Sequence, residues 1–315
     1  MERSCWQDST LSQSSATGAD ILGKDCLMSG TSVHDASKQK MEKPLQLVWN
    51  KDGNLQLNQE ALEVLQSIED PMVVVAVVGA ARTGKSYLMN CLAGDKKGFS
   101  VDSTTQAHTK GIWMWCRSLP QRPNEVLLLL DTEGLGDPDK GDIDNDNSIY
   151  LLAILLSSIL IYNGQRKIDQ QSLQDLHFVT ELSKQIQMKS HPDARDSWDF
   201  VRFFPEFVWV IRDLTLDLNV NGKDVTPNEY LGEIREQDKK YNELRRCIRE
   251  NFPSRCCFAF HFPTYPDNVK KLPELEDQYL FKNFVKERQN LIKYIHNHAK
   301  VKRVLGGQLV TGSSE

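Results

Sequence analysis

The chain has 315 residues, of which 40% are hydrophobic, 26% charged and 8% aromatic, and its formal net charge is −5. This composition excludes a wholly disordered or collagen-like protein and supplies enough apolar side chains for a core. The length allows two domains, although one large α/β domain also fits. Because the chain carries no overall positive charge, nonspecific nucleic-acid binding is disfavoured and no nucleic-acid partner is expected.

Residues 1–40 are rich in Ser, Thr, Gly and Asp and show no hydrophobic periodicity, which predicts a disordered N-terminal extension. Ordered structure is expected from residue 41 onward. Leu45, Leu47 and Trp49 alternate as in a half-buried strand, and a turn at 52–53 leads to a partner strand. Asn58 then has the position of an N-cap for a short helix.

Four segments read as buried strands, and a fifth is expected near the end of the chain. Continuous aliphatic runs of this kind are typical of a sheet covered on both faces. Helices are expected after the first, third and fifth strands, and a capping box at 226–229 begins another helix, highly charged, toward residue 249. Strands that alternate with helices predict an α/β fold with a mainly parallel central sheet flanked by helices. The predicted strands are 72–78, 126–130, 159–162, 207–211 and 256–262, and the predicted helices include 87–93, 173–186 and 281–295.

The strongest motif lies between the first of these strands and the helix that follows it. Gly79-Ala-Ala-Arg-Thr-Gly84-Lys85-Ser86 matches the pattern G-x-x-x-x-G-K-S/T. The glycines let backbone amides curl around phosphates, and the helix N-terminus adds a positive dipole. Lys85 can reach the β- and γ-phosphate oxygens, and the Ser86 hydroxyl can bind Mg²⁺. The pattern therefore predicts a phosphate loop.

Two acidic positions narrow the class of nucleotide. Asp131-Thr-Glu-Gly134 ends a predicted strand, so that Asp131 can hold Mg²⁺ through water and the Gly134 amide can sense a γ-phosphate. The chain has no N-K-x-D, and Asn50-Lys51-Asp52 lies upstream of the phosphate loop and is not a candidate. Asp213 follows a predicted strand, where a carboxylate can accept from both N–H groups of guanine. The residues alone also allow Arg212-Asp213 to be a surface ion pair, and an ATP-using kinase is the weaker alternative.

These motifs occur in a chain that resembles the guanylate-binding proteins, the interferon-inducible large GTPases of the dynamin superfamily. The matching segments are 71–79, 82–90, 108–116, 131–137 and 203–209, and the string His-Thr-Lys-Gly-Ile-Trp-Met-Trp at 108–115 is the most specific. The resemblance runs from about Met41 to about Gly307. It implies a disordered extension at 1–40, a large GTPase (G) domain at 41–305, and at 306–315 the beginning of a linker to an absent helical stalk.

The resemblance implies Mg²⁺-dependent hydrolysis of GTP to GDP, in several members onward to GMP, coupled to G-domain dimerisation in interferon-induced immunity. Arg82 would be the arginine finger that neutralises transition-state charge in cis. By motif, the catalytic residues would be Arg82, Glu133 and Thr109, and the metal ligands Ser86, Thr109 and Asp131. The nucleotide-binding residues would be Gly79, Arg82, Thr83, Gly84, Lys85, Ser86, Tyr87, Gly134, Arg212 and Asp213.

Two positions depart from the expected GTPase pattern. Leu135 stands where a Ras-type GTPase has a water-orienting glutamine, and Ala107 stands where well-studied relatives carry serine. The loss of that hydroxyl favours a second hypothesis, a slow GTP-gated module that pairs with full-length relatives. Segment 235–255 resembles the guanine cap, through which a homodimer or heterodimer would form, while His108 and His177 are interpreted as structural.

The remaining features concern the compartment. The seven cysteines are odd in number, and the adjacent Cys256 and Cys257 do not have the C-x-x-C spacing of a zinc site, so reduced thiols are expected. The N-terminus lacks the apolar segment of a secretory signal. The longest apolar stretch, 149–162, is too short to span a membrane, and the C-terminus lacks a prenylation motif. These features predict a cytoplasmic protein without a direct membrane anchor.

Overall fold

The computed structural model describes residues 41–51, 54–101, 109–136, 143–190, 204–215, 217–220, 222–232, 245–246, 248–303 and 307–313. The chain divides into two units, Met1–Asp35 and Ala36–Glu315, and all of the described residues belong to the second. The predicted disorder of residues 1–40, the turn at 52–53, the switch positions Ala107 and His108, and most of the predicted guanine cap lie outside the described residues.

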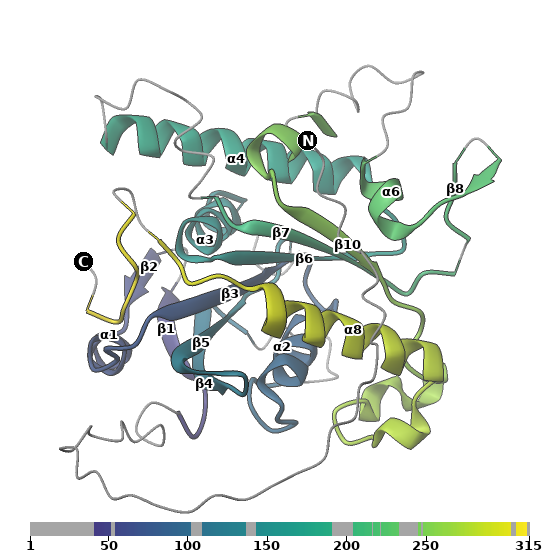
Figure 1. Ribbon diagram of the computed structural model, residues 1–315, viewed down its shortest axis with the longest axis horizontal. Helices are drawn as coiled ribbons and strands as arrows, with labels where there is room; N and C mark the ends of the chain where they lie inside the picture. The colour runs from purple at the N-terminus through teal and green to yellow at the C-terminus, as the bar shows by residue number, and fades with distance from the viewer. Residues whose placement is uncertain are drawn as a thin grey trace, which may run out of the picture. The chain divides into compact units, whose positions relative to one another are not determined.

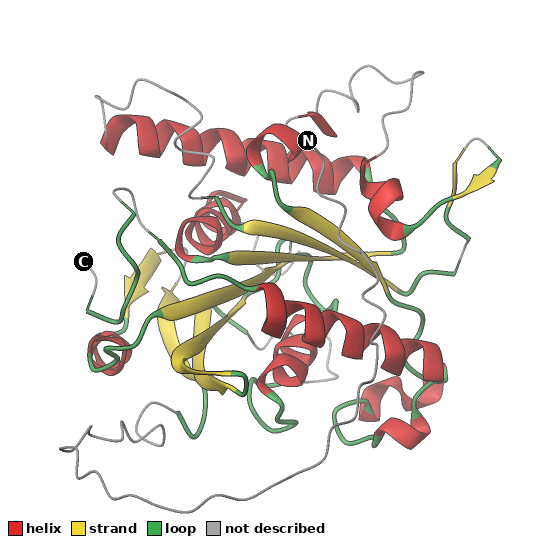
Figure 2. Ribbon diagram, in the orientation of Figure 1, coloured by secondary structure: helices red, strands yellow, loops and turns green. Residues whose placement is uncertain are grey.

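The second unit is built on an eight-stranded sheet with the order β10-β7-β6-β3-β5-β4-β1-β2 (Figures 1 and 2). The five strands from β10 to β5 are parallel, whereas β4, β1 and β2 extend the sheet in antiparallel fashion. A separate hairpin pairs β8 with β9. The strands are β1 Leu45–Lys51, β2 Asn54–Leu57, β3 Met72–Val78, β4 Ile112–Leu119, β5 Arg122–Thr132, β6 Ile159–Gln165, β7 Glu206–Arg212, β8 Asn219–Val220, β9 Lys223–Asp224 and β10 Arg255–Ala259.

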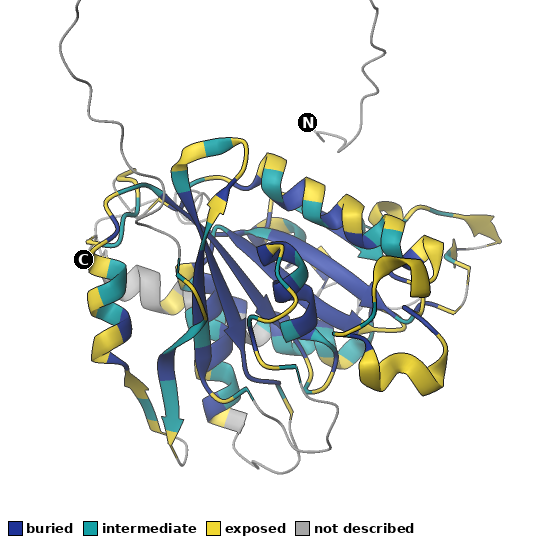
Figure 3. Cartoon of the chain, turned by 90° about the horizontal axis from the view of Figure 1, so that it is seen from below, coloured by how far each residue is buried: buried dark blue, intermediate teal, exposed yellow. Residues whose placement is uncertain are grey.

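Helices cover both faces of the parallel strands, with α3 and α4 on one side and α2 and α8 on the other (Figure 1). The strands at the centre of the sheet are buried (Figure 3), and β3 is buried along its whole length. Alternate side chains of β3 enter two separate apolar cores. Val74, Ala76 and Val78 face α3, while Val73, Val75 and Val77 face α2. The helices are α1 Gln59–Gln66, α2 Lys85–Ala93, α3 Ile143–Leu156, α4 Gln170–Ser190, α6 Pro227–Gly232 and α8 Lys282–His298, with 3₁₀ turns η2 Pro266–Lys271 and η3 Asp277–Tyr279.

Capping residues mark several of the helix boundaries. The Asn58 side chain accepts from the Glu60 amide at 3.1 Å and begins α1, and Gly94 ends α2 in the left-handed conformation with φ 69°. The capping box at α6 is reciprocal: the Thr226 amide donates to Glu229 Oε2 at 2.7 Å, and the Glu229 amide donates to Thr226 Oγ1 at 3.2 Å. The α/β fold with a mainly parallel sheet is confirmed.

Some strand boundaries differ from those predicted. Strand β4 was not predicted, and its antiparallel pairing with β5 lengthens β5 from the predicted 126–130 to Arg122–Thr132. Asp131 therefore lies within the strand rather than after it. Strand β10 ends at Ala259 instead of 262 because the amide of His261 donates to Glu287 Oε2 at 2.9 Å and leaves the ladder.

The cysteines and the longest helices bear on the compartment of the protein. Cys91, Cys116, Cys256 and Cys257 form no disulfide bonds in the described part of the chain. None of the helices in the described ranges is both long and apolar enough to cross a membrane.

Candidate nucleotide site

The predicted phosphate loop connects β3 to α2 at the carboxyl ends of the parallel strands. Gly79 has φ 139°, and a Cβ there would lie 2.4 Å from the carbonyl oxygen of Asn163, so only glycine fits. Gly84 has φ 82° and forms the N-cap of α2. The first amides of the helix therefore face the loop, as an anion site requires.

Side chains from the loop itself and from β6 hold the loop in shape. Lys85 is buried, and its ammonium donates to the carbonyls of Gly79 at 3.2 Å and Ala80 at 3.0 Å. The Asn163 side chain donates to both the carbonyl and the hydroxyl of Thr83, each at 2.9 Å. Arg82 is exposed and has φ 63°. The loop thus presents Arg82 outward while Lys85 folds back over its backbone.

Three oxygen-bearing side chains gather beside this loop. The Ser86 hydroxyl donates to Asp131 Oδ2 at 2.6 Å and lies 3.4 Å from Thr109 Oγ1. Asp131 is fully buried, and its Oδ1 has no hydrogen-bond partner among the described residues. Burial raises the pKa of Asp131 to about 6, against the opposing effects of Ser86 and Lys85. Hydroxyl and carboxylate oxygens with one unsatisfied acceptor fit a hard cation such as Mg²⁺.

Glu133 links the two segments that flank this oxygen cluster. Its side chain is fully buried, and Oε2 accepts from the Gly111 amide at 2.5 Å, while the Glu133 amide donates to Gly111 O at 2.9 Å. Two asparagines donate to Oε1: Asn50 at 2.8 Å and Asn145 at 3.1 Å. The carboxylate therefore ties the segment after Thr109 to the Asp131–Gly134 segment.

Gly134 and Leu135 lie against the phosphate loop. A Cβ on Gly134 would lie 2.2 Å from Ala81 Cα, so the close approach requires glycine. The Leu135 amide donates to Gly79 O at 3.0 Å, and the Ala81 amide donates to Leu135 O at 3.2 Å. The D-x-x-G segment is therefore in direct contact with the predicted phosphate loop.

The two residues of the predicted base-reading pair have different surroundings. Asp213 is partly exposed and has φ 55°, whereas Arg212 is 5% exposed. The Arg212 guanidinium lies 5.5 Å from the Phe260 ring and 5.7 Å from the Phe284 ring, and burial lowers its pKa. Arg212 is therefore enclosed rather than at the surface, and the neighbouring Asp213 charge opposes the effect of burial on its pKa.

Comparison with known proteins decides the family. The sequence model described as "Guanylate-binding protein, N-terminal domain" matches residues 52–304. The chain belongs to the guanylate-binding protein family. Guanylate-binding protein 1 of Chlorocebus aethiops is 49% identical over 287 residues, and guanylate-binding protein 1 of Homo sapiens is 48% identical over 289 residues. Each alignment covers 88% of this chain and 49% of the relative, so the chain spans about half the length of these relatives.

Guanylate-binding protein 2 of Rattus norvegicus is 48% identical over 287 residues, with the same coverage of 88% and 49%. Among solved structures, a variant of Era from Aquifex aeolicus bound to GDP and AlF₄⁻ aligns with 67% of this chain and 58% of that one. Its sequence identity is 16% and its TM-score 0.32.

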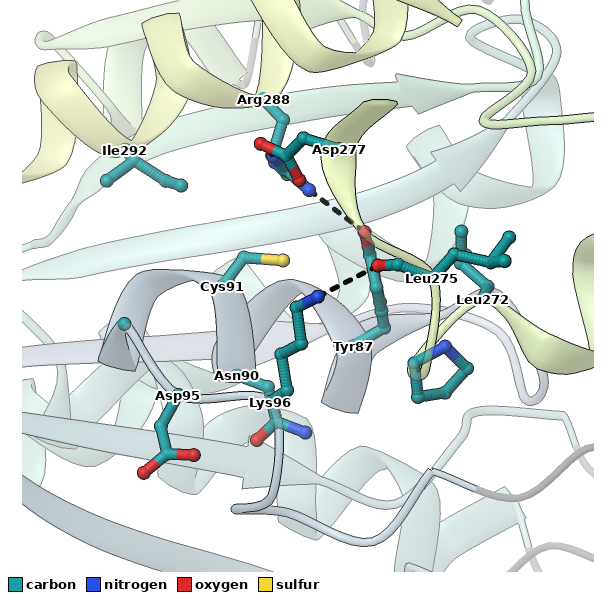
Figure 4. Close-up of a pocket in the computed structure, with 12 residues that line it drawn as sticks. Tyr87, Asn90, Cys91, Asp95, Lys96, Leu272, Leu275, Asp277, Arg288 and Ile292 are labelled. Atoms are coloured by element: carbon teal, nitrogen blue, oxygen red, sulfur yellow. Dashed lines mark hydrogen bonds and ion pairs between the residues drawn. The ribbon is translucent and has the colours of Figure 1, made fainter. Parts of the chain in front are cut away.

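Tyr87 of this guanylate-binding domain turns its side chain into the packing between α2 and α8 (Figure 4). Its hydroxyl accepts from Arg288 Nη1 at 3.2 Å, and its ring centroid lies 6.4 Å from that of Phe284. A cavity of about 200 Å³ adjoins it, with Cys91 on the wall. Because the Tyr87 side chain is used in this packing, the predicted contact between Tyr87 and a nucleotide would have to be made by its backbone, in the first turn of α2.

Sequence reasoning missed three asparagines of the site. Asn50 was considered only as part of a base-reading motif, and Asn145 and Asn163 carried no motif. The structure brings Asn50 and Asn145 to Glu133 and Asn163 to Thr83. The one available signal was that Asn163 follows the apolar run at 159–162, where a buried amide needs partners.

Proposed function

We propose that this guanylate-binding domain binds GTP with Mg²⁺ and hydrolyses it to GDP. The observation that supports this most strongly is the oxygen cluster of Ser86, Thr109 and Asp131 beside the phosphate loop. Ser86 and Thr109 would hold Mg²⁺ by their hydroxyls and Asp131 through water. The bound ion would neutralise charge on the phosphates.

The other predicted site residues take roles that suit their surroundings. Lys85 and the loop amides would bind the phosphates, and the exposed Arg82 would neutralise transition-state charge, an effect worth roughly 10³–10⁵ in rate in other GTPases. The Leu135 side chain has no polar atom to orient water, so Glu133 would organise the attacking water through its buried hydrogen-bond network. Asp213 would accept from N1–H and N2–H₂ of guanine.

Family membership also supports wider proposals. A second hydrolysis, of GDP, would give GMP as a further product. The domain would pair with a second copy of itself or with a related large GTPase, and hydrolysis would be coupled to this dimerisation in interferon-induced immunity. These proposals concern the activity of whole relatives, of which the chain spans about half the length.

The second candidate function is a slow GTP-gated interaction module. Ala107 supports it, because a serine hydroxyl there could orient water or relay a proton, and such roles contribute roughly 10²–10⁴ in rate. The deciding experiment is chromatographic product analysis after incubation with GTP and Mg²⁺, with Lys85→Ala as the blank. GDP or GMP formed over many turnovers supports the enzyme. GTP that stays bound and intact supports the module.

A further inference from the structure

Arg212 is a buried cation whose hydrogen-bonding capacity is only partly used. It is the last residue of β7 and is 5% exposed, and its Nε and Nη1 atoms are buried with no hydrogen-bond partner among the described residues. Its surroundings include the faces of Phe260 and Phe284. Leaving charged donors unsatisfied in the interior costs free energy. A residue of this kind calls for a functional explanation.

The guanidinium lies directly behind the phosphate loop. A Cβ on Gly84 would be 3.5 Å from Arg212 Nη2 and 3.8 Å from Cζ. Gly84 is the N-cap of the nine-residue helix α2, whose positive dipole end faces the same loop. Lys85 adds a second cation at the loop, where its ammonium donates to the Gly79 and Ala80 carbonyls. The helix dipole and two cations therefore all lie at the predicted phosphate loop, where they would favour a bound anion.

We propose that Arg212 is a positioning residue that acts on the nucleotide phosphates from beneath the loop, through its charge and its contact at Gly84, and not on the base. The inference rests on the proposed function, since it presumes that a nucleotide occupies the loop. Asp213, the partly exposed neighbour, then reads the base by itself. The attraction between the Arg212 guanidinium and the phosphates acts through the protein interior, where charges are weakly screened. Its strength should therefore increase with the number of charges on the nucleotide.

The test compares ligands that differ in phosphate number. Calorimetry measures the dissociation constants of GMP, GDP and a non-hydrolysable GTP analogue for wild type, Arg212→Met and Arg212→Lys. Arg212→Met should reduce the preference for the GTP analogue over GMP by on the order of tenfold. Arg212→Lys keeps the charge and should restore most of that preference. Selectivity for GDP over xanthosine diphosphate should stay unchanged in both variants.

Three results would overturn the inference: equal weakening of GMP and the GTP analogue by Arg212→Met, a lysine variant no better than methionine, or altered guanine selectivity. The first two would assign Arg212 a purely structural role, and the third a role at the base. Circular dichroism checks folding, and Arg212→Gln replaces the methionine variant if that one unfolds. Wild-type protein that binds none of the three nucleotides would instead refute the proposed function.

Discussion

Asn50 Nδ2 donates to Glu133 Oε1 across 2.8 Å, joining two residues that are 83 positions apart. Asn50 belongs to β1, in the antiparallel extension of the sheet, and Glu133 directly follows β5. Asn50 thus adds a side-chain contact between the extension and Glu133 to the backbone pairing that already joins β4 to Asp131. Asn50 is one of three described donors that orient the Glu133 carboxylate, together with Asn145 and the Gly111 amide.

Replacement of Asn50 by alanine should therefore slow catalysis more than it weakens binding. A hydrogen bond to a charged group contributes about 1.5–3 kcal/mol, so a decrease in kcat on the order of tenfold to a hundredfold is expected. The affinity for GDP should change little, because Asn50 lies away from the phosphate loop. Single-turnover kinetics and calorimetry measure the two quantities, and the exposed Asn54→Ala serves as the matched control. An unchanged kcat would contradict the proposal that Asn50 orients Glu133 for catalysis.

Ala107→Ser tests whether the missing hydroxyl limits hydrolysis. If it does, the single-turnover rate should rise, by up to the roughly 10²–10⁴ that a general acid–base group contributes. The same substitution combined with Lys85→Ala gives the background rate, measured without nucleotide binding. A rate equal to that of wild type would mean that another group already orients the water.

Asp213→Asn should shift base preference from guanine toward xanthine. The carboxylate pairs with two guanine donors, whereas an amide offers one donor and one acceptor. Competition between GDP and xanthosine diphosphate measures the ratio of affinities, and the exposed Asp217→Asn is the control. If the ratio stays that of wild type, base recognition belongs to another residue.

Lys302 should produce a distinctive pH dependence of stability. Its ammonium donates to Ser157 O at 2.7 Å, and burial lowers its pKa to about 8. The unfolded chain therefore binds more protons than the folded one between about pH 8 and 10.5, so this group's contribution to stability increases with pH across that window. The free energy of unfolding of wild type should rise relative to Lys302→Met by roughly 3 kcal/mol from pH 7 to 11. Parallel pH profiles in urea titrations would contradict the assignment.

The elements that sequence predicted best are those with a local signal. The apolar run of β3, the glycines of the loop and the caps at Asn58 and Thr226 each follow from backbone sterics or hydrogen bonding within a few residues. The phosphate loop and the Asp131 segment were likewise recognisable because their chemistry requires a fixed spacing.

What sequence could not predict depends on pairing across long separations. Strand β4 is rich in tryptophan and read as a motif, and its pairing with β5 and β1 makes it a strand. Asn50 and Asn145 meet at Glu133 because the sheet order places β1 and α3 around one carboxylate. The burial of Arg212 depends on Phe260 and Phe284, which come from β10's end and from α8. No local pattern encodes these contacts.

The central claim is that the loop at 79–86 binds a guanine nucleotide, and thermal unfolding with different nucleotides tests it most directly. With Mg²⁺ present, GDP and GTP should raise the Tm of wild type, since ligand at about 100 times Kd adds about 2.7 kcal/mol of stability. ATP at the same concentration should not raise it, and Lys85→Ala should respond to none of the three. Equal protection by ATP, or protection by GDP that survives in Lys85→Ala, would contradict the account.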